Sequence, residues 1–259
     1  MNRRLHRRIT TASAFAAVLA LPTASLAQIK VIISGGFSAA YREVLPEFER
    51  TTGIKVTTSS GGSFGNGPNT IGAQLRRGVP ADVVILSREG LGELMAEGRI
   101  VAGTDTDLAE TPLGVAVRAG APRPDIGTVE SFKQTLLRAR SVTFTSSTSG
   151  VYLTTTLFPR LGIADEMAGK STTAGAAAVA RGDAEIAIQP MSELLPVPGV
   201  DVVGTIPAAI QKVNVYAAAV VAGSNESEAG KRLIAFLSSE SATAAMKKAG
   251  MEPSKRHIP

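Results

Sequence analysis

Ile29 to Val56 reads IKVIISGGFSAAYREVLPEFERTTGIKV, and this stretch decides the fold class. Its first residues, Ile29 to Ser34, are rich in β-branched side chains and end at two glycines, which predicts a strand. Apolar residues then recur every three or four positions from Phe37 to Phe48, as in an amphipathic helix, and Gly53 is a typical helix end. A second strand follows over residues 54–58, so the stretch predicts a strand–helix–strand unit and a parallel sheet.

The same alternation of short apolar strands and helical segments continues to the end of the chain. We expect further strands at 81–87, 113–118, 141–145, 185–188, 200–203 and 213–221, and helices at 71–77, 89–97, 129–139, 151–161, 174–181, 226–238 and 241–249. With 259 residues, of which 44% are hydrophobic, the chain can form one large α/β domain or two small ones.

The first 27 residues are typical of an export signal. Met1 to Arg8 carries four arginines, an apolar run follows from Ala12 to Leu21, and Ser25-Leu26-Ala27 places small residues before a cleavage point. This order defines a secretory signal peptide, and the apolar run is too short for a membrane span. We therefore expect cleavage near Ala27 and a periplasmic protein. Sec export and twin-arginine export both stay open.

Charge and composition argue against several functional classes. The leader holds four of the 27 Lys and Arg and none of the 22 Asp and Glu, so the mature chain keeps 23 basic residues against 22 acidic ones. A nearly neutral chain with no Trp is not typical of a nucleic-acid-binding protein. Cysteine is absent, and His6 and His257 lie near opposite ends, which disfavours thiol, Ser-His-Asp and multi-histidine metal sites. We expect a monomer with no enzymatic activity, no metal and no cofactor.

Three loops rich in serine and glycine each follow a predicted strand and precede a helix. They are Ser34–Ser38 (SGGFS), Ser59–Ser63 (SSGGS) and Ser146–Gly150 (SSTSG). Hydroxyls, backbone N–H groups and helix N-termini together suit an anion without a positively charged side chain. Any single loop also suits an ordinary turn or helix cap. Because ligands bind beyond the carboxyl ends of parallel strands, the three loops together predict one shared cleft.

The order of these pieces resembles the periplasmic solute-binding proteins of ABC importers, in particular the molybdate-binding-protein-like group of type II receptors. The residues that carry the likeness are Val31–Phe48, Thr52–Val56, Gly78–Ile85 (GVPADVVI), Thr148–Tyr152 (TSGVY), Val179–Ile188 and Val203–Gln211. The resemblance implies an α/β fold of two lobes, each a mixed, mostly parallel sheet flanked by helices. Two crossover strands would join the lobes, and the ligand cleft would lie between them.

Under this resemblance, lobe 1 takes residues 28–112 and 215–259, and lobe 2 takes residues 113–214. In that group, uncharged hydroxyl and backbone donors hold tetrahedral oxyanions, and the closed form is presented to an ABC permease in the inner membrane. The candidate ligand-binding residues are therefore Ser34, Gly35, Gly36, Phe37, Ser60, Gly61, Ser63, Ser147, Ser149, Gly150, Tyr152 and Gln189.

The chain departs from that group at several of these positions. Gly36 stands where the group has its usual first-loop serine, the second loop is longer over Gly65 to Thr70, and Gln189 to Glu193 replaces a common tyrosine. The longer loop and Gln189 suit a larger, flatter anion. We expect the substrate-binding component of an ABC transporter, which captures a small molybdate-like oxyanion or, alternatively, a small di- or tricarboxylate. Presentation of the ligand to a sensor and not to a permease also stays open.

Overall fold

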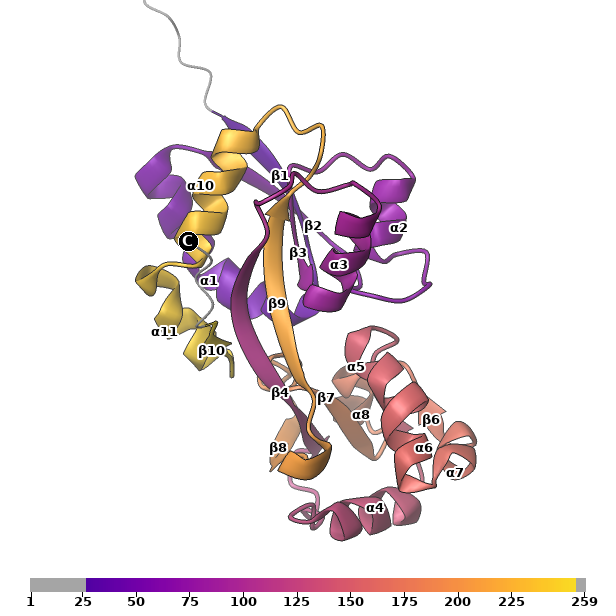
Figure 1. Cartoon of the computed structure of the whole chain (residues 1–259). Coiled ribbons are helices and arrows are strands. Elements are labelled where there is room, and N and C mark those ends of the chain that lie inside the picture. Colours follow the sequence, from indigo (N-terminus) through magenta and orange to yellow (C-terminus); the bar gives the residue numbers. More distant parts are fainter. Residues whose placement is uncertain (1–26, 255–259) are drawn as a thin grey trace, which may run out of the picture.

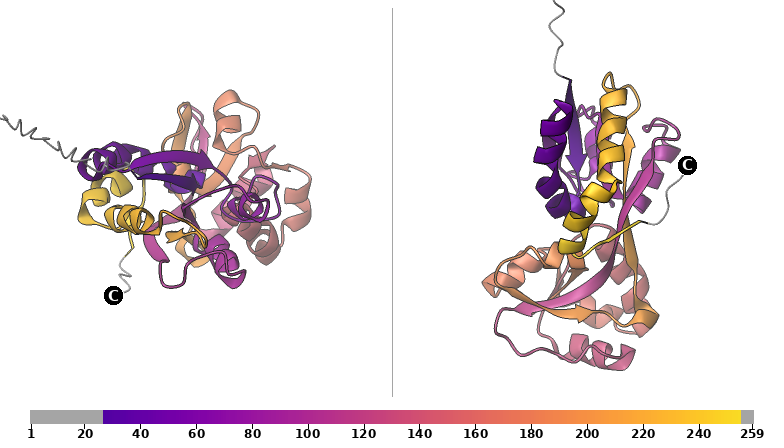
Figure 2. Two further views of the ribbon diagram at one scale, coloured as in Figure 1. Left: turned by 90° about the horizontal axis from the view of Figure 1, so that it is seen from above. Right: turned by 90° about the vertical axis from the view of Figure 1, so that its left-hand side faces the viewer.

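The computed structural model describes residues 27–254, so the predicted leader and His257 lie outside the described residues. The chain forms two lobes joined by two long strands, β4 (Thr106–Arg118) and β9 (Val213–Val220), which extend from one lobe into the other (Figure 1). Figure 2 shows the same two strands between the lobes from the side. No helix within residues 27–254 is long and apolar enough to cross a membrane.

Lobe 1 is built on three parallel strands, β1 (Gln28–Ile33), β2 (Lys55–Ser60) and β3 (Val83–Ser87). The predicted strand–helix–strand unit is confirmed, because α1 (Ser38–Thr52) connects β1 to β2. Gly53 ends α1 with a φ of 72°, a conformation in which a Cβ would be strained. The other elements of this lobe are α2 (Ile71–Arg76), α3 (Arg88–Ala96), α10 (Ser227–Leu237), α11 (Glu240–Lys248) and β10 (Glu252–Pro253).

The strands of lobe 1 are buried on both faces. Val31 and Ile33 of β1 pack with α1, α10 and α11, whereas Ile32 packs on the opposite face with α2 and α3. This alternation follows from side chains that point to opposite sides of a strand. Burial on both faces explains why β3 is an unbroken apolar run up to Ser87.

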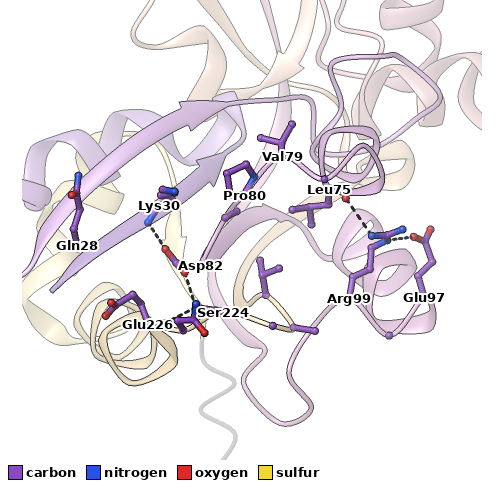
Figure 3. Close-up of a pocket in the computed structure, with 17 residues that line it drawn as sticks. Gln28, Lys30, Leu75, Val79, Pro80, Asp82, Glu97, Arg99, Ser224 and Glu226 are labelled. Atoms are coloured by element: carbon purple, nitrogen blue, oxygen red, sulfur yellow. Dashed lines mark hydrogen bonds and ion pairs between the residues drawn. The ribbon is translucent and has the colours of Figure 1, made fainter.

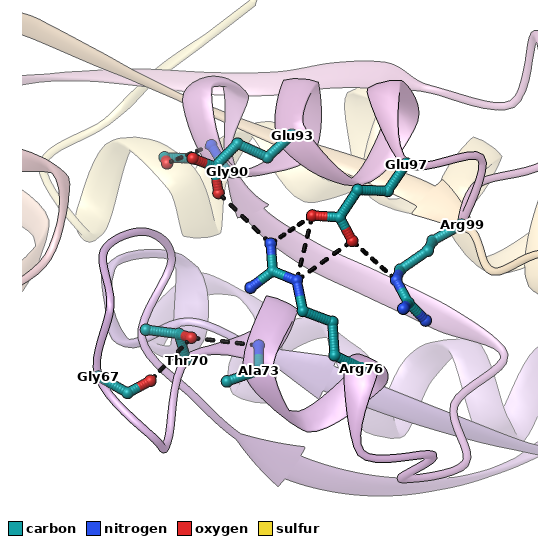
Figure 4. A network of polar contacts seen from close by, with 9 residues as sticks. Gly67, Thr70, Ala73, Arg76, Gly90, Glu93, Glu97 and Arg99 are labelled. Atoms are coloured by element: carbon teal, nitrogen blue, oxygen red, sulfur yellow. Dashed lines mark hydrogen bonds and ion pairs between the residues drawn. The ribbon is translucent and has the colours of Figure 1, made fainter.

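A polar network fixes α2 against α3 (Figure 4). The Nε of Arg76 lies 3.1 Å from Oε1 of Glu97, and the Nε of Arg99 donates to Oε2 of Glu97 at 2.8 Å. The bond from Arg76, followed by that from Arg99, lowers the pKa of Glu97 to about 2. At the start of α2, the Thr70 hydroxyl accepts a hydrogen bond from the Ala73 amide at 3.2 Å. The network therefore anchors the end of the loop over residues 61–70.

The elements of lobe 2 differ in length from the prediction: the strand predicted at 141–145 is shorter, whereas those predicted at 185–188 and 200–203 are longer. Its strands are β5 (Val142–Thr143), β6 (Ser171–Thr172), β7 (Ile186–Pro190) and β8 (Val200–Thr205), and its helices are α4 (Val129–Arg138), α5 (Thr148–Tyr152), α6 (Phe158–Leu161), α7 (Ala164–Ala168), α8 (Ala176–Arg181) and α9 (Met191–Leu194). The helix predicted over 151–161 is α5, a π-helical turn (Leu153–Leu157) and α6 in direct succession. The one-turn helices α7 and α9 escape a search for periodicity because they have no second turn.

The crossover strands produce one continuous mixed sheet in the order β2-β1-β3-β9-β4-β7-β5-β6, with β8 and β10 also paired to β4. The first half of β4 pairs antiparallel with β9, and its second half pairs antiparallel with β7 and β8. The strand predicted at 113–118 is therefore only the second half of β4. Because β4 pairs with strands of both lobes, the carboxyl ends of the parallel strands in each lobe face the same interlobe space.

Candidate functional site

A cavity of about 300 Å³ lies between the two lobes. Its walls come from the ends of β1 and β7 and from the loops that follow β2 and β5. The lining residues are Ser34, Gly35, Ala39, Arg42, Gly62 and Ser63 from lobe 1, and Thr145, Ser147, Ser192, Glu193 and Pro196 from lobe 2. Hydroxyls, backbone groups, one guanidinium and one carboxyl group therefore share one small space.

Ser34 supplies to this cavity a buried hydroxyl without a partner within residues 27–254, as does Ser192. Ser34 directly follows β1, and its amide donates to the Ile85 carbonyl at 2.8 Å, which fixes its backbone to the neighbouring strand. The side chain is only 2% exposed, and its Oγ has no hydrogen-bond partner within the described residues. A buried hydroxyl without a partner costs free energy, so a ligand atom that accepts its hydrogen bond would be favoured.

The second loop places Ser63 at the wall of the cavity through close packing on α3. The Oγ of Ser63 accepts a hydrogen bond from the Ser87 amide at 3.1 Å. Gly90 of α3 lies against the Ser63 carbonyl, and a Cβ at position 90 would overlap that oxygen. Glycine at 90 is therefore required for the loop to approach the helix.

The third loop connects the two lobes directly. The Ser147 hydroxyl accepts a hydrogen bond from the Phe64 amide at 3.2 Å, and the Thr148 hydroxyl donates to Ser87 Oγ at 2.8 Å. Both bonds join lobe 2 to lobe 1 across the edge of the cavity. The structure thus represents an arrangement in which the lobes are closed on each other.

Glu193 brings a carboxyl group into the cavity from α9. One carboxylate oxygen, Oε2, accepts a hydrogen bond from Gln189 Nε2 at 2.6 Å. Burial raises the pKa of Glu193, and the bond from Gln189 lowers it in part. The neighbouring Tyr216 hydroxyl is fully enclosed; burial and then the charge of Glu193 raise its pKa. The site therefore combines a carboxyl group of raised pKa with serine hydroxyls that could donate hydrogen bonds to a ligand.

Arg42 supplies a positive charge to the same cavity from the first turns of α1. It is exposed, and within residues 27–254 it forms no ion pair, in contrast to Arg76 and Arg88. Residues 27–254 contain no group of His, Asp and Glu that could hold a metal ion.

The structure brings some of the twelve predicted residues together and separates others. Ser34, Gly35, Ser63 and Ser147 line the cavity. Ser60 borders a neighbouring hollow that it shares with Arg42, and Gly61 packs against Gln74 and Ile71. Ser149 and Gly150 are buried in α5.

The remaining predicted residues do not line the cavity. Gly36 lies so close to the Tyr216 hydroxyl that a Cβ would overlap it, and Phe37 is a core residue. The Tyr152 hydroxyl donates to the Ile210 carbonyl at 2.9 Å and does not line the cavity. Gln189 reaches the site through Glu193. Arg42, Ser192 and Glu193 also line the cavity but were not predicted from the sequence; the replacement of a tyrosine by residues 189–193 was the signal for the last two.

A larger hollow of about 700 Å³ at the far end of lobe 1 is a weaker candidate (Figure 3). It lies at the amino ends of β1 and β3, opposite the edge at which parallel sheets bind ligands. The carboxylates of Asp82 and Glu97 already have partners: Asp82 accepts hydrogen bonds from the Lys30 amide and the Ser224 hydroxyl, each at 2.7 Å, and Glu97 accepts one from Arg99 at 2.8 Å. Nothing in this hollow is left unpaired in the way that Ser34 is.

Comparisons with known proteins agree with this architecture. Residues 29–252 match the family model described as bacterial extracellular solute-binding protein, and the chain belongs to that family. A curated relative, named aconitate isomerase, from Pseudomonas sp, is 40% identical over 229 residues, which are 87% of each chain.

Solved structures of binding proteins share the fold at low sequence identity. The periplasmic molybdate-binding protein of Azotobacter vinelandii aligns with a TM-score of 0.69 and 20% identity over 86% of this chain and 98% of its own. The sulfate-binding protein SubI of Mycobacterium tuberculosis aligns with a TM-score of 0.68 and 18% identity over 88% of each chain. The predicted resemblance and the predicted two-lobed α/β fold are therefore confirmed.

Proposed function

We propose that the protein binds a small unsaturated polycarboxylate between its lobes and interconverts the double-bond isomers of that compound. The observation that carries the proposal is the meeting of Glu193 and Arg42 in one cavity of serine hydroxyls. The 40% identical aconitate isomerase supports a tricarboxylate of the aconitate class as the ligand.

The donor set favours a carboxylate over a tetrahedral oxyanion. A guanidinium matches the planar geometry of a carboxylate and can donate two parallel hydrogen bonds to it. The cavity of about 300 Å³ is at the lower end of the range for small-molecule sites.

Isomerisation requires no residue type that the chain lacks. The sequence analysis predicts no enzymatic activity because cysteine is absent and histidine is scarce. A proton shift next to a carboxylate needs neither residue, because a single carboxyl group can accept and return the proton. Glu193 is such a group, and our proposal therefore departs from the expectation of a pure receptor.

The test uses the purified chain without the leader. Trans-aconitate is incubated with the protein, and cis-aconitate is followed by liquid chromatography; calorimetry measures the binding of trans-aconitate, molybdate, sulfate and the saturated analogue tricarballylate. We expect conversion of aconitate, binding of tricarballylate without turnover, and weaker binding of the inorganic anions. Tight molybdate or sulfate binding with no affinity for either tricarboxylate would contradict the proposal.

Capture of the same anion for an ABC permease is the second candidate function. The description of the family as extracellular solute-binding proteins favours it. In this function the chain would be a periplasmic monomer, cleaved near Ala27, that presents the closed form to a permease or, in the sensor variant, to a receptor. Uptake of radiolabelled tricarboxylate by cells with and without the gene distinguishes transport from isomerisation alone.

A further inference from the structure

We propose that Glu193 is the acid–base group that moves the proton during isomerisation, and that Gln189 is the residue that positions it. This inference rests on the proposed function, which identifies Glu193 as a suitable carboxyl group but assigns no role to either of its oxygens or to Gln189. The two oxygens of the Glu193 carboxyl group have different surroundings.

One oxygen of Glu193 is fixed and the other is free. Oε2 accepts the hydrogen bond from Gln189 Nε2 at 2.6 Å. Oε1 accepts no hydrogen bond within the described residues and faces Gly35 across the cavity, where a Cβ built at position 35 would lie 3.9 Å away. Since Gly35 has no side chain, the space in front of Oε1 stays open for a substrate carbon.

Gln189 is itself held in one orientation. Its side-chain oxygen accepts a hydrogen bond from the Ala176 amide at 2.6 Å, at the start of α8. That bond determines which end of the amide carries the oxygen, so the NH₂ group must point toward Glu193. Gln189 is 4% exposed and lies in β7, an element buried throughout its length. A rigid donor behind the carboxylate keeps Oε1 directed into the cavity.

The surroundings suit a group that must both accept and return a proton. The groups next to Glu193 are Gln189 from β7 and Tyr216 from β9, and Arg42 from α1 lines the same cavity. Burial disfavours the charged carboxylate and raises the pKa of Glu193 above the ordinary value of a glutamate. An acid–base group works best when its pKa is near the working pH.

The reaction balances without any co-reactant. Glu193 Oε1 removes a proton from the methylene carbon next to the double bond; the electron pair of that C–H bond forms the new double bond, and the old double bond becomes a carbanion stabilised by its carboxylate. The protonated Glu193 then returns the proton to that distant carbon. Arg42 and Ser34 would hold carboxylates of the substrate and would stabilise the negative charge that develops on them.

The test compares Glu193→Gln with Glu193→Asp and with Glu228→Gln, an exposed site on α10 remote from the cavity. Conversion of trans-aconitate gives activity, and calorimetry with tricarballylate gives binding. We expect Glu193→Gln to lose at least about 100-fold in activity, whereas its affinity should stay the same or increase, because the charge removed repels the anionic ligand. Glu193→Asp should keep measurable activity, and Glu228→Gln should match the unmodified protein.

The possible failures are distinguishable. If the unmodified protein neither binds tricarballylate nor converts aconitate, the proposed function is wrong, and the assignment of Glu193 is wrong with it. If the unmodified protein is active and Glu193→Gln retains more than a tenth of that activity, only the assignment is wrong. Loss of tricarballylate binding together with activity would also overturn the assignment, because Glu193 would then be a binding group.

Discussion

The Ser34 hydroxyl has no hydrogen-bond partner in the described part of the protein, and under our proposal it donates a hydrogen bond to the ligand. Its Oγ is buried and unpaired, so Ser34→Ala removes no hydrogen bond from the protein alone. The free energy of unfolding should change little or rise slightly. Binding of tricarballylate should weaken by about 1.5–3 kcal/mol, the range for a hydrogen bond to a charged group. Calorimetry and thermal unfolding of Ser34→Ala measure the two effects, and Ser238→Ala at the end of α10 serves as the control. An unchanged affinity would place the ligand away from Ser34.

Gln189 should control the pH dependence of the reaction through Glu193. The hydrogen bond from Gln189 favours the ionised carboxylate, so its removal raises a pKa that burial has already raised. Since Glu193 must be ionised to accept a proton, kcat/KM should increase with pH through that pKa. In Gln189→Met the rising part of the profile should therefore move to higher pH. A profile that keeps its position, or that moves to lower pH, would show that Gln189 does not act on Glu193.

The residue scale also shows what the sequence could not determine. Ser34, Ser63 and Ser147 were predicted because serine at a strand–helix junction is a recognisable pattern. Arg42 was not, because an arginine on an exposed helix face normally contacts only water. Arg42 lines the cavity because residues of lobe 2 form the other side of that cavity. No pattern within α1 indicates this.

At the scale of elements, α3 determines the position of the second loop. Gly90→Ala would place a Cβ onto the Ser63 carbonyl, which can retreat only by moving the loop. We expect a loss of about 1–3 kcal/mol in the free energy of unfolding from overpacking, and weaker ligand binding. Gly92→Ala is the matched control on the same helix, because its Cβ would meet no atom within 4 Å. This control should be neutral or stabilising by about 0.5–1 kcal/mol. Urea unfolding of both variants measures the difference, and equal stabilities would contradict the packing argument.

Elements differ in how well the sequence predicts them. α1 was predictable from its three- and four-residue periodicity and the glycine at its end, and β1 and β2 were predictable as short runs rich in β-branched residues. α9 was not, because Met191–Leu194 is a single turn without an N-terminal side-chain cap. It forms where β7 ends and packs against β4, so its cause is tertiary contact and not local propensity. The carboxyl group at the centre of our proposal therefore lies on an element that sequence periodicity cannot detect.

At the scale of the whole molecule, the family resemblance predicted two lobes and two crossover strands, and the fold confirms both. The bonds that close the lobes were beyond the sequence, because they join residues far apart in the chain. They include Thr148 to Ser87, at 2.8 Å, and the ion pair of Lys212 with Glu89 at 2.5 Å. Such bonds are weak individually, so ligand binding across the cavity should shift the balance between open and closed forms.

The absence of cysteine permits a direct test of that closure. In the double variant Ser87→Cys/Thr148→Cys, the two thiols replace hydroxyls that lie 2.8 Å apart only when the lobes are closed. We expect tricarballylate to accelerate formation of the disulfide, because it increases the closed population. The control is Thr128→Cys/Ser131→Cys, which replaces hydroxyls 3.0 Å apart within lobe 2. Its oxidation should not respond to the ligand. Non-reducing electrophoresis over time follows both reactions, and equal rates with and without ligand in the interlobe pair would mean that binding does not close the lobes.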